Sequence, residues 1–227
     1  MHDPAAPDLD DQPFAVMDCA LITIASGVRV QNLKEFREGL LKAPLGSLDH
    51  HFWGRLLRPQ FDEPEYNNDF ASWAWRGLHD KELAERLSMV TPTSYPDQES
   101  LRQEVLEILE QRLDERELVP WAMADQQFHF LYSQTVVFDT SLRCTTPEDL
   151  AQRLRALSTG SIYYHFIDAR NRTAQRCDDF SVWLGGRDAK STELAARLWR
   201  IDPYFSSLKE LCQIIAGLFE QYFPART

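Results

Sequence analysis

One segment of the chain occurs twice, and this repeat limits the fold more than any other feature of the sequence. Residues 46–52 read Gly-Ser-Leu-Asp-His-His-Phe, and residues 160–166 read Gly-Ser-Ile-Tyr-Tyr-His-Phe. At the same shift of 114 positions, Phe14–Arg58 matches Phe128–Arg172 without a gap, and shorter matches follow in the same order. Because chance similarity does not preserve the order of several blocks, the sequence predicts an internal duplication.

The duplication predicts two tandem pseudo-twofold repeats, each a short strand or hairpin followed by four to five helices. Two such copies can pack as one globular unit, with their strands in one antiparallel sheet. The expected class is α+β and predominantly helical. The expected boundaries are a disordered acidic tail at 1–13, repeat 1 at 14–117, a connector at 118–127 and repeat 2 at 128–223.

Local signals place the elements that begin each repeat. The apolar residues of Phe14–Ala25 predict a strand that Gly27 ends, with a short strand at Val28–Val30 after it. The second strand is expected at Phe128–Asp139. Ser47 and Ser161 are each expected at the start of a helix that carries a histidine, with Ser47 as the N-cap, and Asp69 is expected to open the next helix.

Polar residues that match between the repeats are the candidates for a site. On a helix, Ser47, His51 and Arg58 lie on one face, and their counterparts in the second repeat do the same. An arginine and an aspartate in each repeat could converge on this face. The full set is Arg29, Ser47, His51, Arg58, Asp69, Arg143, Ser161, His165, Arg172 and Asp179.

Three interpretations of this set are open, and a buried hydrogen-bond network is favoured because most such polar groups are structural. The second is an anion or sugar site in each repeat, with arginines as donors and a histidine as acid or base. The third is a face that binds a partner.

Composition excludes several classes of partner. A net charge of −11 argues against nucleic acid and anionic membranes, which bind clustered lysine and arginine. A small anionic metabolite or another protein is compatible with the rest of the sequence. The four cysteines are far apart, which favours free thiols in the cytoplasm over disulfides or a zinc site.

Motifs that would identify an enzyme were not found. The chain has no G-x-G-x-x-G, P-loop, G-x-S-x-G, H-E-x-x-H or EF-hand pattern. His50 and His51 are adjacent and should diverge on a helix, so we expect no metal site and no cofactor. The sequence favours a non-enzymatic binding or regulatory module. The alternative is an enzyme or sensor for a small anionic or sugar-like metabolite.

Two segments resemble the hallmark segments of an uncharacterised prokaryotic family that is known only as a domain of unknown function. They are residues 65–70, Glu-Tyr-Asn-Asn-Asp-Phe, and residues 160–170, which begin with the second copy of the repeat. The resemblance covers about Phe14 to Phe223 and implies a soluble protein, but no activity, cofactor or catalytic residue. The second half lacks the acidic loop of the first and has Asp178 in place of Asn68, so two sites need not be equivalent.

A structural role for the second histidine gives a first testable prediction. Replacing His165 with alanine should lower the free energy of unfolding by about 1–3 kcal/mol, because a buried partner would lose its hydrogen bond. Thermal or urea denaturation measures this change. An unchanged stability together with a lost response to a ligand would instead indicate a functional role.

Overall fold

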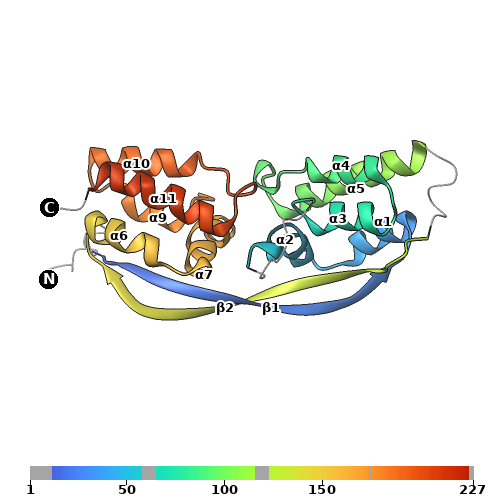
Figure 1. Cartoon of the computed structure of the whole chain (residues 1–227), viewed down its shortest axis with the longest axis horizontal. Coiled ribbons are helices and arrows are strands. Elements are labelled where there is room, and N and C mark those ends of the chain that lie inside the picture. The colour runs from blue at the N-terminus through green and yellow to red at the C-terminus, as the bar shows by residue number, and fades with distance from the viewer. Residues whose placement is uncertain (1–11, 58–64, 116–122, 174, 225–227) are drawn as a thin grey trace, which may run out of the picture. The chain divides into compact units, whose positions relative to one another are not determined.

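The computed structural model describes residues 12–57, 65–115, 123–173 and 175–224. Two long strands, β1 (Phe14–Val30) and β2 (Phe128–Cys144), pair in an antiparallel two-stranded sheet (Figure 1). Most of the other elements are helices, so the predicted α+β, mostly helical class is confirmed. The predicted tail at 1–13 and connector at 118–127 lie mostly outside the described residues, as does Arg58.

Both strands are longer than the sequence predicted, because Gly27 bends β1 without ending it. Gly27 has a φ of 81°, a left-handed conformation that costs glycine little. The Ser26 hydroxyl donates a hydrogen bond of 2.6 Å to the carbonyl oxygen of Phe130 and accepts one from the N–H of Val28. The Ser26 side chain therefore links β2 to the part of β1 that follows the bend, a local adjustment like that at a β-bulge.

The same bend occurs in β2, where the sequence predicted an end at Asp139. Ser141 has a φ of 62°, and the Thr140 hydroxyl donates 2.5 Å to the carbonyl oxygen of Val16 and accepts from the N–H of Leu142. The contacts of Ser26 and Thr140 are therefore equivalent at the 114-residue shift. Both early strand ends were wrong because a hydroxyl next to a left-handed residue can replace the hydrogen bonds that the bend removes.

The chain divides into two compact units, and each strand contributes to both. Unit 1 is Met1–Ala20 with Val136–Thr227, and unit 2 is Leu21–Thr135. The first part of β1 therefore belongs to the unit that contains the last helices of the chain. The first part of β2 belongs to the unit that contains the first helices.

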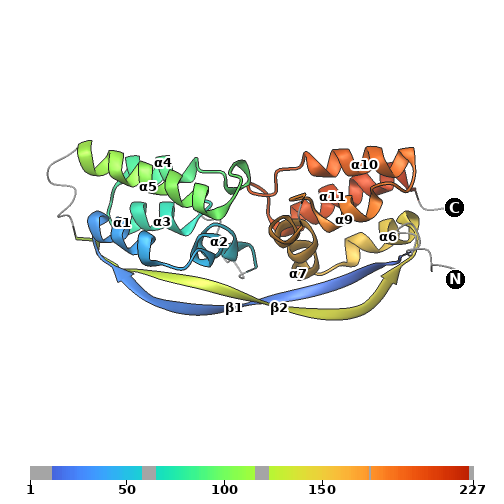
Figure 2. The same ribbon diagram turned by 180° about the vertical axis from the view of Figure 1, so that it is seen from behind.

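Unit 2 contains the helices of the first half of the chain, which are seen from behind in Figure 2. They are α1 (Leu33–Lys42), α2 (Gly46–Trp53) with the 3-10 turn η2 (Gly54–Leu57), α3 (Asp69–Arg76), α4 (Lys81–Ser88), the 3-10 turn η3 (Pro92–Ser94) and α5 (Gln98–Glu115). The Asn32 side chain caps α1 by accepting the N–H of Glu35, as asparagine commonly does at helix N-termini. Buried Phe36, Phe70, Phe128 and Phe130 form the aromatic core of this unit.

Unit 1 contains the helices of the second half. They are α6 (Pro147–Arg153), the 3-10 turn η5 (Leu154–Ala156), α7 (Thr159–Ile162), the π-helical turn η6 (Tyr163–Asp168), α8 (Ala169–Arg172), α9 (Asp179–Leu184), α10 (Ala189–Trp199) and α11 (Leu208–Tyr222). Pro147 is the first residue of α6, a position that proline favours. Phe14 packs against Phe180 and Trp183, with ring centroids 5.2 and 5.4 Å away. Among the described residues, no helix has the length and apolar character needed to cross a membrane.

The helix starts that the sequence assigned to the two serines were wrong. Helix α2 follows Leu45 without a side-chain cap, and Ser47 is buried inside its first turn. Helix α7 is capped by Ser158, whose hydroxyl accepts the N–H of Ser161 at 2.9 Å. Helix α3 begins at Asp69, as expected, and the side chain of Asn68 caps it.

The glycine that begins the second copy of the repeat is needed for a close approach to β1. A Cβ atom on Gly160 would lie within 3.0 Å of both the Asp18 carboxylate and the Cys19 carbonyl oxygen, whereas on Gly46 it would meet only Tyr132 at 3.9 Å. We therefore expect Gly160→Ala to lower the free energy of unfolding by about 1–3 kcal/mol. Gly46→Ala is the matched control and should be nearly neutral in urea denaturation. Equal effects of the two substitutions would contradict this packing.

Candidate functional site

His51 is buried in unit 2 and uses both ring nitrogens. Its Nδ1 lies 3.0 Å from Oδ2 of Asp69, at the start of α3. Its Nε2 accepts a hydrogen bond of 3.0 Å from the backbone N–H of Leu131 in β2. The residue is only 2% exposed. His51 therefore ties α2 to α3 on one side and to a strand 80 residues away on the other.

His165 makes the equivalent contacts in unit 1. Its Nδ1 lies 2.7 Å from Oδ2 of Asp179, at the start of α9, and its Nε2 accepts 2.9 Å from the backbone N–H of Met17 in β1. It too is 2% exposed. We refer to Asp69–His51–Leu131 and Asp179–His165–Met17 as the two histidine clamps. All three members of one clamp correspond to those of the other in the aligned halves.

The direction of the backbone hydrogen bond determines the protonation state of each ring. A backbone N–H can only donate, so Nε2 must carry a lone pair rather than a proton. In a neutral imidazole the proton is then on Nδ1, which donates it to the aspartate. Both histidines are therefore neutral, and no ring nitrogen is left to take a proton from a substrate.

Aromatic side chains surround both imidazoles. Phe128 lies 4.7 Å from the His51 ring, and Phe14 lies 4.8 Å from the His165 ring, between ring centroids. Phe70 and Phe180 pack on the same two rings at 5.0 and 5.6 Å. This packing excludes water, which strengthens the clamp hydrogen bonds and makes their loss more costly.

Among the described arginines of the predicted set, Arg172 joins a clamp. Its Nη2 lies 3.0 Å from the Asp179 oxygen that also faces His165, and its Nε lies 2.7 Å from Asp168. The guanidinium also lies 3.9 Å from the ring centroid of Tyr164. The Asp179 carboxylate therefore bridges a buried histidine and a partly exposed arginine.

Of the predicted residues that the structure describes, the remaining four do not converge on the clamps. Arg29 and Arg143 are exposed on the strands, and Arg143 pairs with Asp139 at 2.6 Å. The Ser161 hydroxyl accepts from Ser158, and the buried Ser47 hydroxyl has no hydrogen-bond partner in the described part of the chain. The expected convergence of these arginines was wrong, because strand residues in a bent ribbon direct alternate side chains to solvent.

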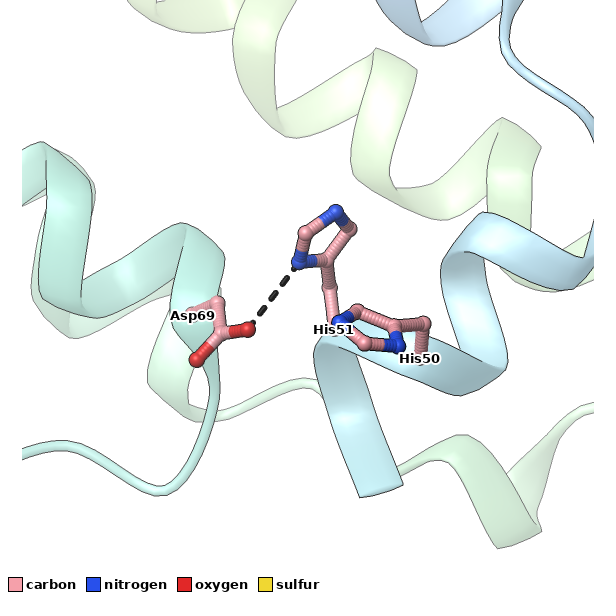
Figure 3. Close-up of side chains that lie close together, drawn as sticks. All are labelled: His50, His51 and Asp69. Atoms are coloured by element: carbon pink, nitrogen blue, oxygen red, sulfur yellow. Dashed lines mark hydrogen bonds and ion pairs between the residues drawn. The ribbon is translucent and has the colours of Figure 1, made fainter. Parts of the chain in front are cut away.

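His50 adds a second imidazole beside the clamp of unit 2 (Figure 3). Donor atoms of His50, His51 and Asp69 all lie within 4.8 Å of one another, although adjacent helix residues were expected to diverge. The His50 Nδ1 is 2.5 Å from the Ser133 hydroxyl. To bind a metal through Nδ1, a neutral His51 would need its proton on Nε2, where it would oppose the N–H of Leu131. The clamp geometry therefore does not fit a metal ligand at His51.

Two buried charged groups were not singled out from the sequence. Arg112 in α5 is 5% exposed and makes a two-pronged contact with Asp80, 2.8 and 3.0 Å long, which raises the pKa of Arg112. Burial raises the pKa of the Asp178 carboxyl, which caps α9 by accepting from Ser181. An arginine among the charges of an amphipathic helix carries no sequence signal of burial. Asp178 could have been recognised from its position before α9.

The two most buried cysteines are poor nucleophiles. Burial raises the pKa of the Cys19 thiol to about 12 and that of Cys144 to about 11. Reactive cysteines need the thiolate, which these environments disfavour. The clamps and the thiols of the described residues thus point to structural rather than chemical roles.

The fold and the clamps define an α+β, mostly helical protein whose two compact units each bind a strand through a buried histidine. The family model described as "Family of unknown function (DUF5752)" matches residues 11–220, and the chain belongs to this family. The structure of OrfY from Thermoproteus tenax is similar, with a TM-score of 0.80 and 29% sequence identity over 96% of this chain and 100% of OrfY. No curated protein has a significant match to the chain.

Because the two clamps have equivalent contacts, their loss should have similar effects. We expect His51→Ala to lower the free energy of unfolding by about 1–3 kcal/mol, as for His165→Ala, because each leaves a buried strand N–H without its acceptor and removes the imidazole that donates to the aspartate. His79 is the control, since its ion pair with Asp125 has a 66% exposed imidazole. His79→Ala should change stability by no more than about 0.5 kcal/mol. If urea denaturation shows that His79→Ala loses as much free energy of unfolding as the two clamp variants, the clamp assignment is contradicted.

Proposed function

We propose that this chain is a non-enzymatic binding or regulatory module made of two fused repeats. The observation that carries the proposal is the use of both histidine rings in structural hydrogen bonds. An acid–base catalyst needs a ring nitrogen within reach of its substrate, and here each Nε2 faces a backbone N–H inside an aromatic core. The family to which the chain belongs is described as one of unknown function, so membership does not favour an enzymatic activity.

The proposed origin of the module is a duplication of one ancestral repeat. The histidine and strand members of the two clamps, and the hydroxyl contacts at the two strand bends, recur at a shift of 114 positions. The clamp aspartates Asp69 and Asp179 follow after a short deletion and contact the same ring nitrogen. Before the fusion, two identical copies of the repeat would have exchanged the first part of their strands, as in a twofold dimer with exchanged strands. Fusion of the two copies gives one chain whose halves can diverge.

The proposed partner is another protein, and unit 1 has the more suitable surface. Trp199 at the end of α10 and Phe205 just after it are 60% and 65% exposed. Exposed aromatic side chains contribute strongly to protein interfaces. The net charge of −11 argues against nucleic acid and anionic membranes. We place the module in the cytoplasm, because all four cysteines are free thiols.

A comparison of two surface variants tests the proposal. Proteins crosslinked to the chain in a lysate of its source organism should be recovered about tenfold less by a Trp199→Ser/Phe205→Ser double variant. Met89→Ser is the control, because Met89 is 79% exposed at the end of α4 in unit 2. It should retain the same crosslinked proteins as the wild type.

Two results would overturn the proposal. One is an identical set of crosslinked proteins for the wild type and the double variant. The other is a rise in melting temperature with phosphorylated sugars or organic anions that His165→Gln abolishes, because a ligand stabilises the state that it binds. That second result would favour the alternative, a sensor or enzyme that uses the His165, Arg172 and Asp179 group.

A further inference from the structure

The hydrogen bonds of the two clamps are compatible with only one charge state of the histidines. Each Nε2 accepts a backbone N–H, from Leu131 in unit 2 and from Met17 in unit 1, over 3.0 and 2.9 Å. A proton on Nε2 would place two donors against each other at this distance. The strand and the protonated ring could then no longer stay in contact.

We propose that the two clamps form a proton-sensitive latch, in which protonation of His51 and His165 releases β2 and β1 from the helices of their units. Histidine is the side chain that gains its charge closest to neutral pH, so modest acidification can act on it. The latch does not depend on the proposed binding function. It gives the module two states that a change of pH can select.

In unit 1 charged groups of both signs lie around His165. The Asp179 carboxylate on α9 lies 2.7 Å from Nδ1 of His165. Arg172 on α8 contacts the same carboxylate oxygen at 3.0 Å. Asp168 on η6 binds Arg172, and Asp18 on β1 accepts the N–H of Cys19 beside Met17. The aromatic rings of Phe14, Tyr164 and Phe180 complete the surroundings.

In unit 2 the same pattern holds with a different neighbour. Asp69 on α3 faces His51, and Nε of Arg55 on η2 lies 3.8 Å from the other oxygen of that carboxylate. His50 stands edge-on to His51 with ring centroids 5.0 Å apart, where Tyr164 stands in unit 1. In both units an aspartate faces Nδ1, and the strand N–H on Nε2 is the group that protonation of the ring would displace.

Release of the latch would expose a part of each strand that the structure protects. Each strand has one strand neighbour in the described sheet, and the clamp histidine takes an N–H that faces the helices instead. Strand edges with unoccupied N–H groups are ready to pair with other chains. Acidification should therefore loosen the first part of each strand before the helices unfold.

The test compares urea denaturation of the full chain at several pH values, from about pH 8 to about pH 5. In the wild type, stability should fall on acidification with a slope of up to about two protons taken up on unfolding. Stability falls with falling pH because the folded state requires neutral rings, whereas each ring can bind a proton in the unfolded state. The double variant His51→Gln/His165→Gln should lose this slope, since a glutamine amide oxygen accepts the same N–H without taking a proton. His79→Gln should keep the wild-type slope.

The proposal fails if the wild type and the double variant have the same pH dependence, or if His79→Gln removes it. Hydrogen exchange in the wild type keeps the test decisive if the double variant does not fold. After correction for intrinsic exchange rates, the amides of Met17 and Leu131 should lose protection on acidification before those of Leu83 and Leu194 in the helices. Simultaneous loss of protection at all four amides would also overturn the latch.

Discussion

A backbone N–H that donates to a buried imidazole is the interaction on which the rest of this structure depends. It occurs twice, from Met17 to His165 and from Leu131 to His51. In each case it joins a helix to a strand that is far away in the sequence, inside a core of phenylalanines. The aspartates Asp69 and Asp179 fix the tautomer that makes this bond, because they accept the proton on the opposite nitrogen.

Much of the fold could be predicted because local signals agreed with it. Asn32 and Pro147 are residue types that favour helix starts, and apolar residues recur at helical spacing along α5. The strand ends were misjudged, since glycine usually interrupts a strand and the hydroxyls of Ser26 and Thr140 compensate only in three dimensions. The association of the first part of each strand with the helices of the other half could not be predicted either. Sequence proximity favours packing onto the helices that follow directly.

Part of the candidate set lies together in the structure, but the geometry could not be predicted. Comparison of the two halves of the sequence singled out both histidines and both aspartates because they occupy matching positions, and each histidine lies beside its aspartate. It also suggested Arg29 and Arg143, which lie exposed on the strands and contact neither clamp. The partners of Nε2 could not be predicted, since a backbone N–H is present at every residue except proline and leaves no trace in the sequence. His50 was misjudged because ring orientation, not helical spacing, brings it to Asp69.

The tautomer of the two buried histidines tests this account most directly. Nitrogen-15 NMR of the imidazole rings in the wild-type protein at neutral pH distinguishes a protonated from an unprotonated nitrogen. The account predicts that His51 and His165 are neutral with the proton on Nδ1, and that each Nε2 is coupled through a hydrogen bond to the amide of Leu131 or Met17. A proton on Nε2 of either ring, in the folded protein, would contradict it.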